Sequence, residues 1–233
     1  MNIQAVLFDL DFTLAKPGPD LGPEGYERLG RRFGLELDPA TYKEARAKAV
    51  EGLRKHPDFR HDEEIWVAFT ERIIRGMGGD SDRASEFAVE MTRAWEHAHN
   101  FDLYDDVPPV LDELRRRGLK LGIVSNTGRD VHEFLAHHKL EVDAALSSRV
   151  HGKVKPHPTI FRAVLDSLGV PADQAAMVGD SPEDDLEGAR ALGMQAFLVD
   201  REGVYPDAGD RLPDLFALPA ALGISSGRSP DTS

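Results

Sequence analysis

Residues 6–14 read VLFDLDFTL, and the fold can be worked out from this stretch. Val6, Leu7 and Phe8 form an uninterrupted apolar run, which is typical of a strand buried on both of its faces. Asp9 ends the run, and Asp11 follows after one intervening residue. Because an unpaired carboxylate is costly in a dry core, we expect the strand to deliver both carboxylates to a site at its tip.

Strand and helix patterns alternate in the second half of the chain. Apolar runs typical of strands lie at residues 119–126, 144–148, 175–180 and 195–200, and they alternate with helical patterns at 108–118, 130–140, 157–169 and 181–193. One weaker helical pattern lies within residues 203–222. Such alternation predicts a doubly wound α/β fold, in which helices cover both faces of a parallel sheet.

A segment of different character separates the first strand from this second half. Residues 16–23 are rich in proline and glycine, which interrupt regular structure. From there to about residue 99 the apolar side chains recur at helical spacing, as do Ile65, Phe69 and Ile73. We therefore expect an α/β core at 1–15 and 101–222, an all-helical insert at 16–100 and a disordered tail at 223–233. An insert after the first strand lies over the carboxyl edge of the sheet, where open α/β sheets bind ligands.

Composition limits the classes of partner. The chain has 233 residues, a formal net charge of −13 and no cysteine. So acidic a surface repels phosphate backbones and anionic membranes, and we expect neither nucleic acid nor membrane as a partner. Disulfides and thiolate metal sites are excluded by the absence of cysteine. No signal peptide or membrane-spanning run is visible, so the expected location is the cytoplasm; the sequence does not indicate an oligomeric state.

Polar side chains cluster where the predicted strands end. Besides Asp9 and Asp11, the candidates are Ser125 and Asn126 after the second strand, Lys153 and Lys155 in the loop before the helix at 157–169, and Asp180, Asp184 and Asp185 after the fourth strand. The carboxyl ends of parallel strands meet at one edge of the sheet, so these groups are expected to share a crevice. Of the two lysines, Lys153 is expected on the surface.

The residue types in this crevice suit phosphate chemistry. Asp9, Asp11 and Asp180 are hard oxygen ligands, and three dry carboxylates repel one another unless a cation such as Mg²⁺ neutralises them. A lysine and a hydroxyl beside the ion suit the remaining oxygens of an anion. One carboxylate can act as a nucleophile toward phosphorus, and a second can protonate a leaving group and then activate water.

Four separated motifs, in order, resemble those of the haloacid dehalogenase superfamily, in its phosphatase branch. They are DLDFTL at 9–14, IVSNT at 123–127, KPHPTIF at 155–161 and VGDSPEDDLEGA at 178–189. The resemblance implies a Rossmann-like core, a helical cap of the C1 type at the insert, and Mg²⁺ as cofactor. The substrate it implies is a small phosphorylated metabolite, hydrolysed through an aspartyl-phosphate.

The resemblance also implies a role for each matching residue. Asp9 matches the nucleophile and Asp11 the acid/base, whose backbone carbonyl also binds the metal that Asp9 and Asp180 hold. Ser125, Asn126 and Lys155 match the phosphate-binding groups. Thr13 matches the residue that steadies the loop after the nucleophile. Asp184 or Asp185, with a preference for Asp185, matches a helix carboxylate that holds metal-bound water or Lys155.

One position departs from the family pattern, and several alternatives stay open. Phe12 stands where the family usually has glycine, which puts the shape of the nucleophile loop in doubt. The alternatives are a 2-haloacid dehalogenase, which needs no metal and lacks the second aspartate, a phosphomutase, and a binding protein without catalysis. The aromatic side chains at helical spacing in the insert, Trp66, Phe69, Phe87 and Trp95, are expected in the core of the cap rather than around substrate.

Overall fold

A six-stranded parallel sheet forms the centre of the molecule. The computed structural model describes residues 2–53, 56–79 and 81–224. The sheet strands are β1 (Ala5–Phe8), β4 (Lys120–Ser125), β5 (Ala144–Ser147), β6 (Ala175–Gly179), β7 (Gln195–Val199) and β8 (Arg211–Leu212). Their order is β5-β4-β1-β6-β7-β8. The chain therefore adds strands to one side of β1 and then to the other, which confirms the predicted doubly wound class.

Strand β1 is buried on both faces, as its apolar run predicts. Its four residues are fully buried, and they pair with β4 on one side and β6 on the other. Val6 and Phe8 pack into one hydrophobic cluster, whereas Ala5 and Leu7 pack into a second. Because neighbouring side chains of a strand point to opposite faces, β1 anchors the core on both sides of the sheet.

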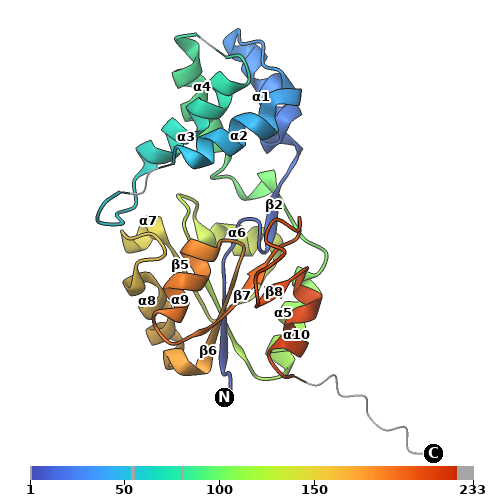
Figure 1. Cartoon of the computed structure of the whole chain (residues 1–233), viewed down its shortest axis with the longest axis vertical. Helices are drawn as coiled ribbons and strands as arrows, with labels where there is room; N and C mark the ends of the chain where they lie inside the picture. The colour runs from blue at the N-terminus through green and yellow to red at the C-terminus, as the bar shows by residue number, and fades with distance from the viewer. Residues whose placement is uncertain (1, 54–55, 80, 225–233) are drawn as a thin grey trace, which may run out of the picture.

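Helices cover both faces of this sheet (Figure 1). They are α5 (Val107–Arg116), α6 (Val131–His138), α7 (Ser148–His151), α8 (Pro158–Leu168), α9 (Gly188–Arg190) and α10 (Leu218–Ala221). Apolar residues of α5, α6 and α10 share the cluster of Val6, and those of α8 and α9 share the cluster of Leu7. The helix expected at 181–193 is a π-helix at Pro182–Glu187 followed by the short α9. Strand β8 lies within residues 203–222, where the sequence predicts only a weak helix.

The region between the first strand and the rest of the core is helical, as expected. It contains α1 (Pro23–Gly30), α2 (Tyr42–Glu51), α3 (Glu63–Gly76) and α4 (Arg83–Ala94). Strands β2 (Ala15–Pro17) and β3 (Phe101–Leu103) pair antiparallel and carry the chain out to these helices and back. The four helices lie beyond the carboxyl end of β1 (Figure 1), and we call them the helical cap. Its boundaries at 16 and 100 stay predictions, and the expected tail falls mostly outside the described residues.

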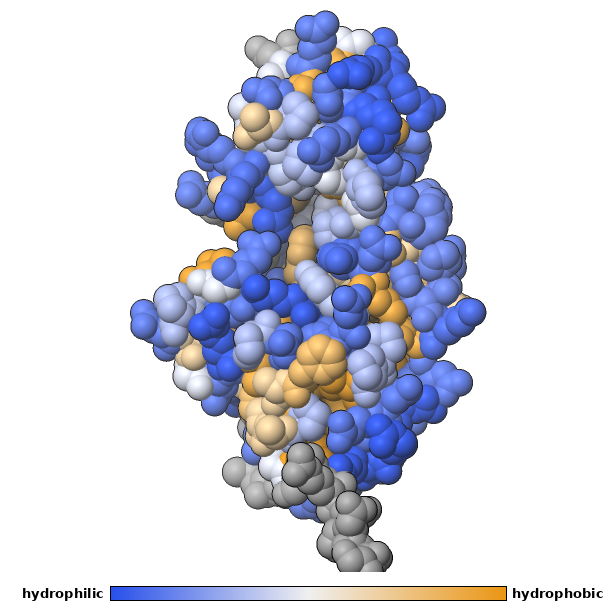
Figure 2. All heavy atoms as spheres, turned by 90° about the vertical axis from the view of Figure 1, so that its right-hand side faces the viewer, coloured by the Kyte–Doolittle hydropathy of each residue, from blue (hydrophilic) through white to orange (hydrophobic). Residues whose placement is uncertain are grey.

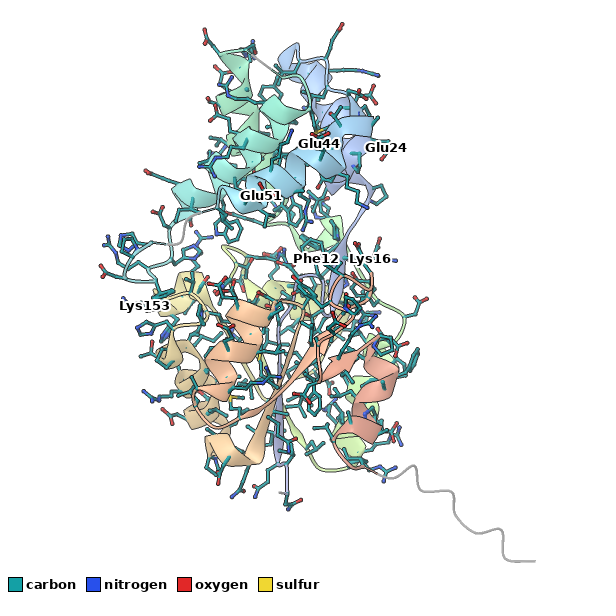
Figure 3. All side chains as sticks on the ribbon, viewed as in Figure 1. Phe12, Lys16, Glu24, Glu44, Glu51 and Lys153 are labelled. Carbon is teal, nitrogen blue, oxygen red and sulfur yellow. The ribbon has the colours of Figure 1, made fainter. Side chains whose placement is uncertain are left out.

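A second contact joins the cap to the core. The backbone of Phe59 accepts a hydrogen bond from Val154, and His61 donates one to the carbonyl of Gly152. Lys153, labelled in Figure 3, donates to the carbonyl of Asp58 at 2.6 Å. This loop of the cap therefore lies against the segment that leads to Lys155. Within the part of the chain that the structure describes, no helix is long and apolar enough to cross a membrane.

Candidate active site

A buried lysine joins two aspartates at the carboxyl edge of the sheet. The Nζ atom of Lys155 lies 2.5 Å from Oδ1 of Asp9 and 2.6 Å from Oδ1 of Asp185. Asp9 directly follows β1, Lys155 lies in the loop before α8, and Asp185 lies in the π-helix after β6. All three residues are buried. The structure thus brings together three candidate site residues that are far apart in the sequence.

Asp180 completes a cluster of carboxylates. Oxygen atoms of Asp9, Asp180 and Asp185 lie within 4.8 Å of one another. Gly179 makes this approach possible, because a Cβ at that position would lie 2.1 Å from Oδ2 of Asp185. The Asp185 carboxylate also accepts a hydrogen bond from the backbone N–H of Ser181 at 3.0 Å. The glycine and the turn after β6 therefore let the helix carboxylate reach back to the strand ends.

Burial and mutual repulsion disturb the protonation of this cluster. Burial raises the pKa of Asp9 to about 7, against an opposing attraction by Lys155 and with a further rise from Asp185. The pKa of Asp180 is also raised well above its usual value, first by burial and then by the charge of Asp9. The pKa of Lys155 is raised because the two carboxylates outweigh its own burial. Lys155 is therefore a permanent cation at neutral pH.

The donor set of the cluster fits Mg²⁺. Its ligand atoms are all oxygens, which this ion prefers, and it commonly binds through a few carboxylates. Three carboxylates and one ammonium leave an excess of two negative charges, which a divalent cation would balance. Burial is the main cause of the raised pKa values of Asp9 and Asp180, and the neighbouring carboxylates of the cluster raise both values further.

The carboxylate of Asp11 lies apart from this cluster, which corrects the expectation that it groups with Asp9 and Asp180. Among the described residues, Asp185 takes its place. Asp11 is held instead by Arg129, whose Nη1 and Nη2 lie 3.0 and 3.4 Å from its two oxygens. Binding of metal by the Asp11 backbone carbonyl stays a prediction.

Phe12 adopts the conformation that glycine favours at this position. Its φ is 62°, in the left-handed region, where a side chain is strained. Figure 3 labels Phe12 at the level where the cap meets the core. Its ring lies 6.4 Å from that of Trp95, and the guanidinium of Arg46 lies 5.0 Å from the centre of the Phe12 ring. The loop keeps the glycine-type turn, and the extra ring becomes part of a cavity wall.

Asn126 joins β4 to the loop that carries Lys155. Its Oδ1 accepts a hydrogen bond from the backbone N–H of Lys155 at 2.6 Å, and its Nδ2 donates to the Lys155 carbonyl at 3.2 Å. Nδ2 also lies 3.4 Å from an oxygen of Asp184. The side chain thus holds the backbone of Lys155 in place and also lines the cavity that contains Asp9, and its binding of phosphate stays a prediction. Ser125, at the end of β4, is buried and lines the same cavity as Asp9.

Thr13 steadies its loop through the backbone rather than through its side chain. Its hydroxyl is buried, and within the described residues it has no hydrogen-bond partner. Its carbonyl accepts a hydrogen bond at 2.9 Å from Arg201, which also pairs with both oxygens of Asp106 and stacks on Tyr104. Sequence reasoning missed Arg201, which lies two residues after the end of β7 and outside all four motifs.

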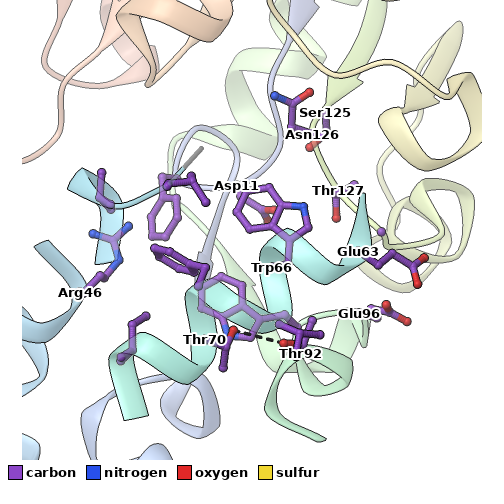
Figure 4. A pocket seen from close by; sticks show the side chains of 18 of the residues that line it. Asp11, Arg46, Glu63, Trp66, Thr70, Thr92, Glu96, Ser125, Asn126 and Thr127 are labelled. Carbon is purple, nitrogen blue, oxygen red and sulfur yellow. Dashed lines mark hydrogen bonds between the residues drawn. The ribbon is translucent and has the colours of Figure 1, made fainter. Parts of the chain in front are cut away.

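A cavity of about 520 Å³ extends from the aspartates into the cap (Figure 4). Its core side includes Asp9, Asp11 and Lys155. The cap side is largely aromatic and aliphatic, and the molecular surface is hollowed between cap and core (Figure 2). Three of the four aromatic residues expected in the cap core line this cavity and are half-buried: Trp66, Phe69 and Trp95. Of these four aromatic residues, only Phe87 is fully buried in the core.

The cap wall of the cavity also contains polar groups. The hydroxyls of Thr70 and Thr92 lie in this wall and are hydrogen-bonded to each other.

Comparison with known proteins agrees with this architecture. Residues 3–193 match the family model described as haloacid dehalogenase-like hydrolase. The chain is 41% identical over 227 residues to a phosphatase of Mycobacterium tuberculosis, covering 95% of this chain and 98% of that protein. It is 33% identical over 243 residues to phosphoserine phosphatase of Thermus thermophilus, covering 91% and 94% respectively.

Solved structures of both reaction types resemble this one. A haloacid dehalogenase-type phosphatase from Thermococcus onnurineus is 28% identical with a TM-score of 0.66, and a 2-haloacid dehalogenase from Pseudomonas syringae is 26% identical with a TM-score of 0.61. Each alignment covers 95% of this chain and 98% of the other. The family match spans most of the chain and includes all four motifs. The chain therefore belongs to the haloacid dehalogenase-like hydrolases.

Proposed function

We propose that this hydrolase is a magnesium-dependent phosphatase that acts on small phosphorylated metabolites through an aspartyl-phosphate. The observation that carries the proposal is the cluster of Asp9, Asp180 and Asp185 around Lys155, with Asp11 on the same cavity wall. The two curated relatives described above are both named as phosphatases. Mg²⁺ held by the cluster would supply positive charge for the phosphate oxygens.

The residues of the chain suggest two chemical steps. In the first, an oxygen of Asp9 bonds to phosphorus, the bond from phosphorus to the substrate oxygen breaks, and Asp11 donates a proton to the departing alcohol. In the second, Asp11 takes a proton from water, the water oxygen bonds to phosphorus, and the bond to Asp9 breaks. Lys155 and Ser125 both line the cavity, and they would bind phosphoryl oxygens during both steps.

The cap side of the cavity would hold the organic part of the substrate. About 520 Å³ is more space than a phosphoryl group needs, and it lies within the usual range of small-molecule sites. Trp66, Phe69 and Trp95 offer apolar surface there. Selection among phosphomonoesters is therefore assigned to the cap, and bond breaking to the core.

Dehalogenation of a 2-haloacid is the second candidate, because the Pseudomonas syringae dehalogenase shares this fold. That reaction also starts with attack by an aspartate, but it requires neither a cation nor a proton donor. Two features favour the phosphatase: the surplus of carboxylates around Lys155 and the presence of Asp11 in the cavity.

One assay separates the two candidates. Phosphate release from 4-nitrophenyl phosphate is measured with Mg²⁺ and with EDTA, and chloride release from 2-chloropropionate is measured in parallel. Phosphate release that stops in EDTA and returns with Mg²⁺ supports the phosphatase. Chloride release that persists in EDTA, without phosphate release, would establish the dehalogenase. Asp166→Asn, an exposed aspartate on α8, is the matched control for variants of Asp9.

A further inference from the structure

We propose that Arg129 is the positioning residue for the acid/base carboxylate of Asp11. The inference rests on the proposed function, in which Asp11 transfers protons. Arg129 is not part of the four motifs, and its sequence context, TGRD, gives no reason to expect it inside the protein. Nevertheless its side chain is among the largest that are fully buried.

The guanidinium of Arg129 is held on every side. It stacks on Phe101 at 3.8 Å from the ring centre and lies 5.1 Å from the ring of Phe134. Its Nε and Nη2 donate hydrogen bonds to the carbonyl of Trp95 at 3.2 and 3.0 Å. These contacts leave Nη1 and Nη2 directed at the two oxygens of Asp11. A planar fork fixed in this way sets both the direction and the plane of the carboxylate.

Arg129 also joins Asp11 to the cap. Trp95 directly follows α4, and Phe101 begins β3, so both lie where the chain returns from the cap to the core. One side chain thus contacts the acid/base residue, the returning segment and α6 of the core. The placement of Asp11 consequently depends on this segment as well as on the nucleophile loop.

The test uses substrates that differ in their need for a proton. An alkyl phosphate such as glycerol phosphate has a poor leaving group, whereas 4-nitrophenyl phosphate leaves almost without protonation. The ratio kcat/KM includes only the steps up to departure of the alcohol. We expect Arg129→Met to lower kcat/KM on the alkyl phosphate on the order of 10- to 100-fold, as for the partial loss of a general acid, and on the aryl phosphate about 3-fold or less.

A double-mutant comparison separates positioning from general damage. With Asp11→Asn already present, Arg129→Met is expected to produce no further loss on the alkyl phosphate. Arg201→Met is the matched control, since Arg201 is also a largely buried arginine that stacks on an aromatic ring, but it pairs with Asp106 and the Thr13 carbonyl rather than with the Asp11 carboxylate. Its losses are expected to be equal on both substrates. Arg129→Lys, which keeps the charge, serves for the same measurements if the methionine variant does not fold.

Two results would overturn the inference. One is an equal loss on alkyl and aryl phosphates for Arg129→Met. The other is a further loss in the Asp11→Asn background as large as in the parent enzyme. If Asp11→Asn itself leaves both substrates unaffected, then the proposed acid/base role fails, which is a distinct outcome.

A second, independent observation concerns the substrate itself, and from it we infer that the organic group carries a second anion. Of the cations that line the cavity, Lys155 pairs with Asp9 and Asp185, and Arg149 lies 3.5 Å from Glu63. Arg46, on α2, has neither a hydrogen bond nor an ion pair to any residue within 2–53, 56–79 and 81–224. Its guanidinium lies over the ring of Phe12, 5.0 Å from the ring centre, and the residue lines the same cavity as Asp11 (Figure 4).

A guanidinium that faces the cavity and has no carboxylate partner among the described residues suits a carboxylate or a second phosphate, which it can bind through two parallel hydrogen bonds. The proposed substrate class is therefore a phosphomonoester whose organic part bears a second negative charge. This deepens the proposed function and rests on it.

Phenyl phosphate and 4-carboxyphenyl phosphate form a matched pair for this test. The parent enzyme is expected to favour the carboxylated ester, and Arg46→Met to raise its KM on the order of 10-fold, as for the loss of one charged hydrogen-bond pair. The KM for phenyl phosphate should stay unchanged, and Arg46→Lys should recover part of the preference. Equal KM values for the two esters in the parent enzyme would reject the inference, while their hydrolysis would still uphold the phosphatase. Failure to hydrolyse either ester would count against both.

Discussion

Lys155 and Arg46 face the same cavity, one from the core and one from the cap, and their surroundings differ completely. Lys155 is buried between two carboxylates, and its backbone is held by Asn126. Arg46 is half-exposed and has no carboxylate partner among the described residues. On the core side, the charged groups are therefore already paired before substrate binds. On the cap side, Arg46 has no carboxylate partner among the described residues, and the substrate could supply one. Rate would then depend on the core and selection on the cap.

The largest effect is expected from the nucleophile. Asp9→Asn keeps the size of the side chain but removes the charge that would attack phosphorus, so turnover should fall to background, roughly 10⁴-fold or more. Phosphate release and trapping of a phospho-enzyme at low pH measure it. Asp166→Asn should retain full activity. A phosphorylated residue other than Asp9 would contradict the mechanism.

Lys155→Met should impair every phosphate substrate alike. The change leaves two buried carboxylates without their cation, and breaking a buried ion pair typically destabilises by about 3–5 kcal/mol. We expect both a lower thermal midpoint and a loss of activity on the order of 100-fold, assayed on acetyl phosphate and on a bulky aryl phosphate. Lys153→Met is the matched control in the same loop, because its Nζ contacts only the carbonyl of Asp58 in the described structure. If activity falls only on bulky substrates, Lys155 contributes to the choice of substrate and not to a step common to all of them.

The contrast between core and cap also marks what could be predicted from the sequence. The strand ends and their carboxylates follow local rules, because an apolar run that stops at an aspartate identifies both strand and site. The preference for Asp185 over Asp184 as the partner of Lys155 agrees with the geometry. Their roles in catalysis stay predictions.

Features that depend on long-range packing could not be predicted in this way. Arg129 is buried only because Phe101, Phe134 and the carbonyl of Trp95 converge on it, and these lie on three separate segments. Helical spacing identifies one buried face of a helix, but it does not distinguish a hydrophobic core from a cavity wall. For this reason Trp66, expected in the cap core, lines the cavity instead, and Trp95 both packs against the core and lines the cavity, whereas Phe87 is buried in the core as expected.

The burial of Asp9 beside other carboxylates should make stability depend on pH when no metal is bound. Burial raises the pKa of Asp9 to about 7 in the folded chain, against an ordinary value of 3.8. Between these values the folded state keeps a proton that the unfolded state has lost, so stability falls as pH rises through this window and levels off above it. In EDTA, the thermal midpoint should therefore be lower at about pH 8 than at about pH 5.

Added Mg²⁺ should raise the midpoint more at the higher pH, where the carboxylates are ionised and can bind it. Calorimetry at both pH values measures the difference. Asp9→Asn should weaken the dependence on pH and on Mg²⁺, whereas Asp166→Asn should retain both. An equal rise at the two pH values would show that the ion binds elsewhere, and no rise at all would remove the metal from the site.

The smallest effect is expected from the cap. Trp66 lines the cavity from α3, so Trp66→Ala removes apolar surface from the space assigned to the organic group. Stacking on an aromatic ring contributes about 0.5–1.5 kcal/mol, so KM for an aryl phosphate should rise about 2- to 12-fold. Acetyl phosphate, which takes little binding energy from the cap, should be nearly unaffected, and kcat should change little for either substrate. Glu64→Ala, an exposed change on the same helix, should alter neither KM. The separation of tasks predicts this pattern because Trp66 belongs to the cap and carries no group that breaks bonds. If Trp66→Ala lowers kcat equally on both substrates, the cap takes part in catalysis, and the contrast between Lys155 and Arg46 no longer divides rate from selection.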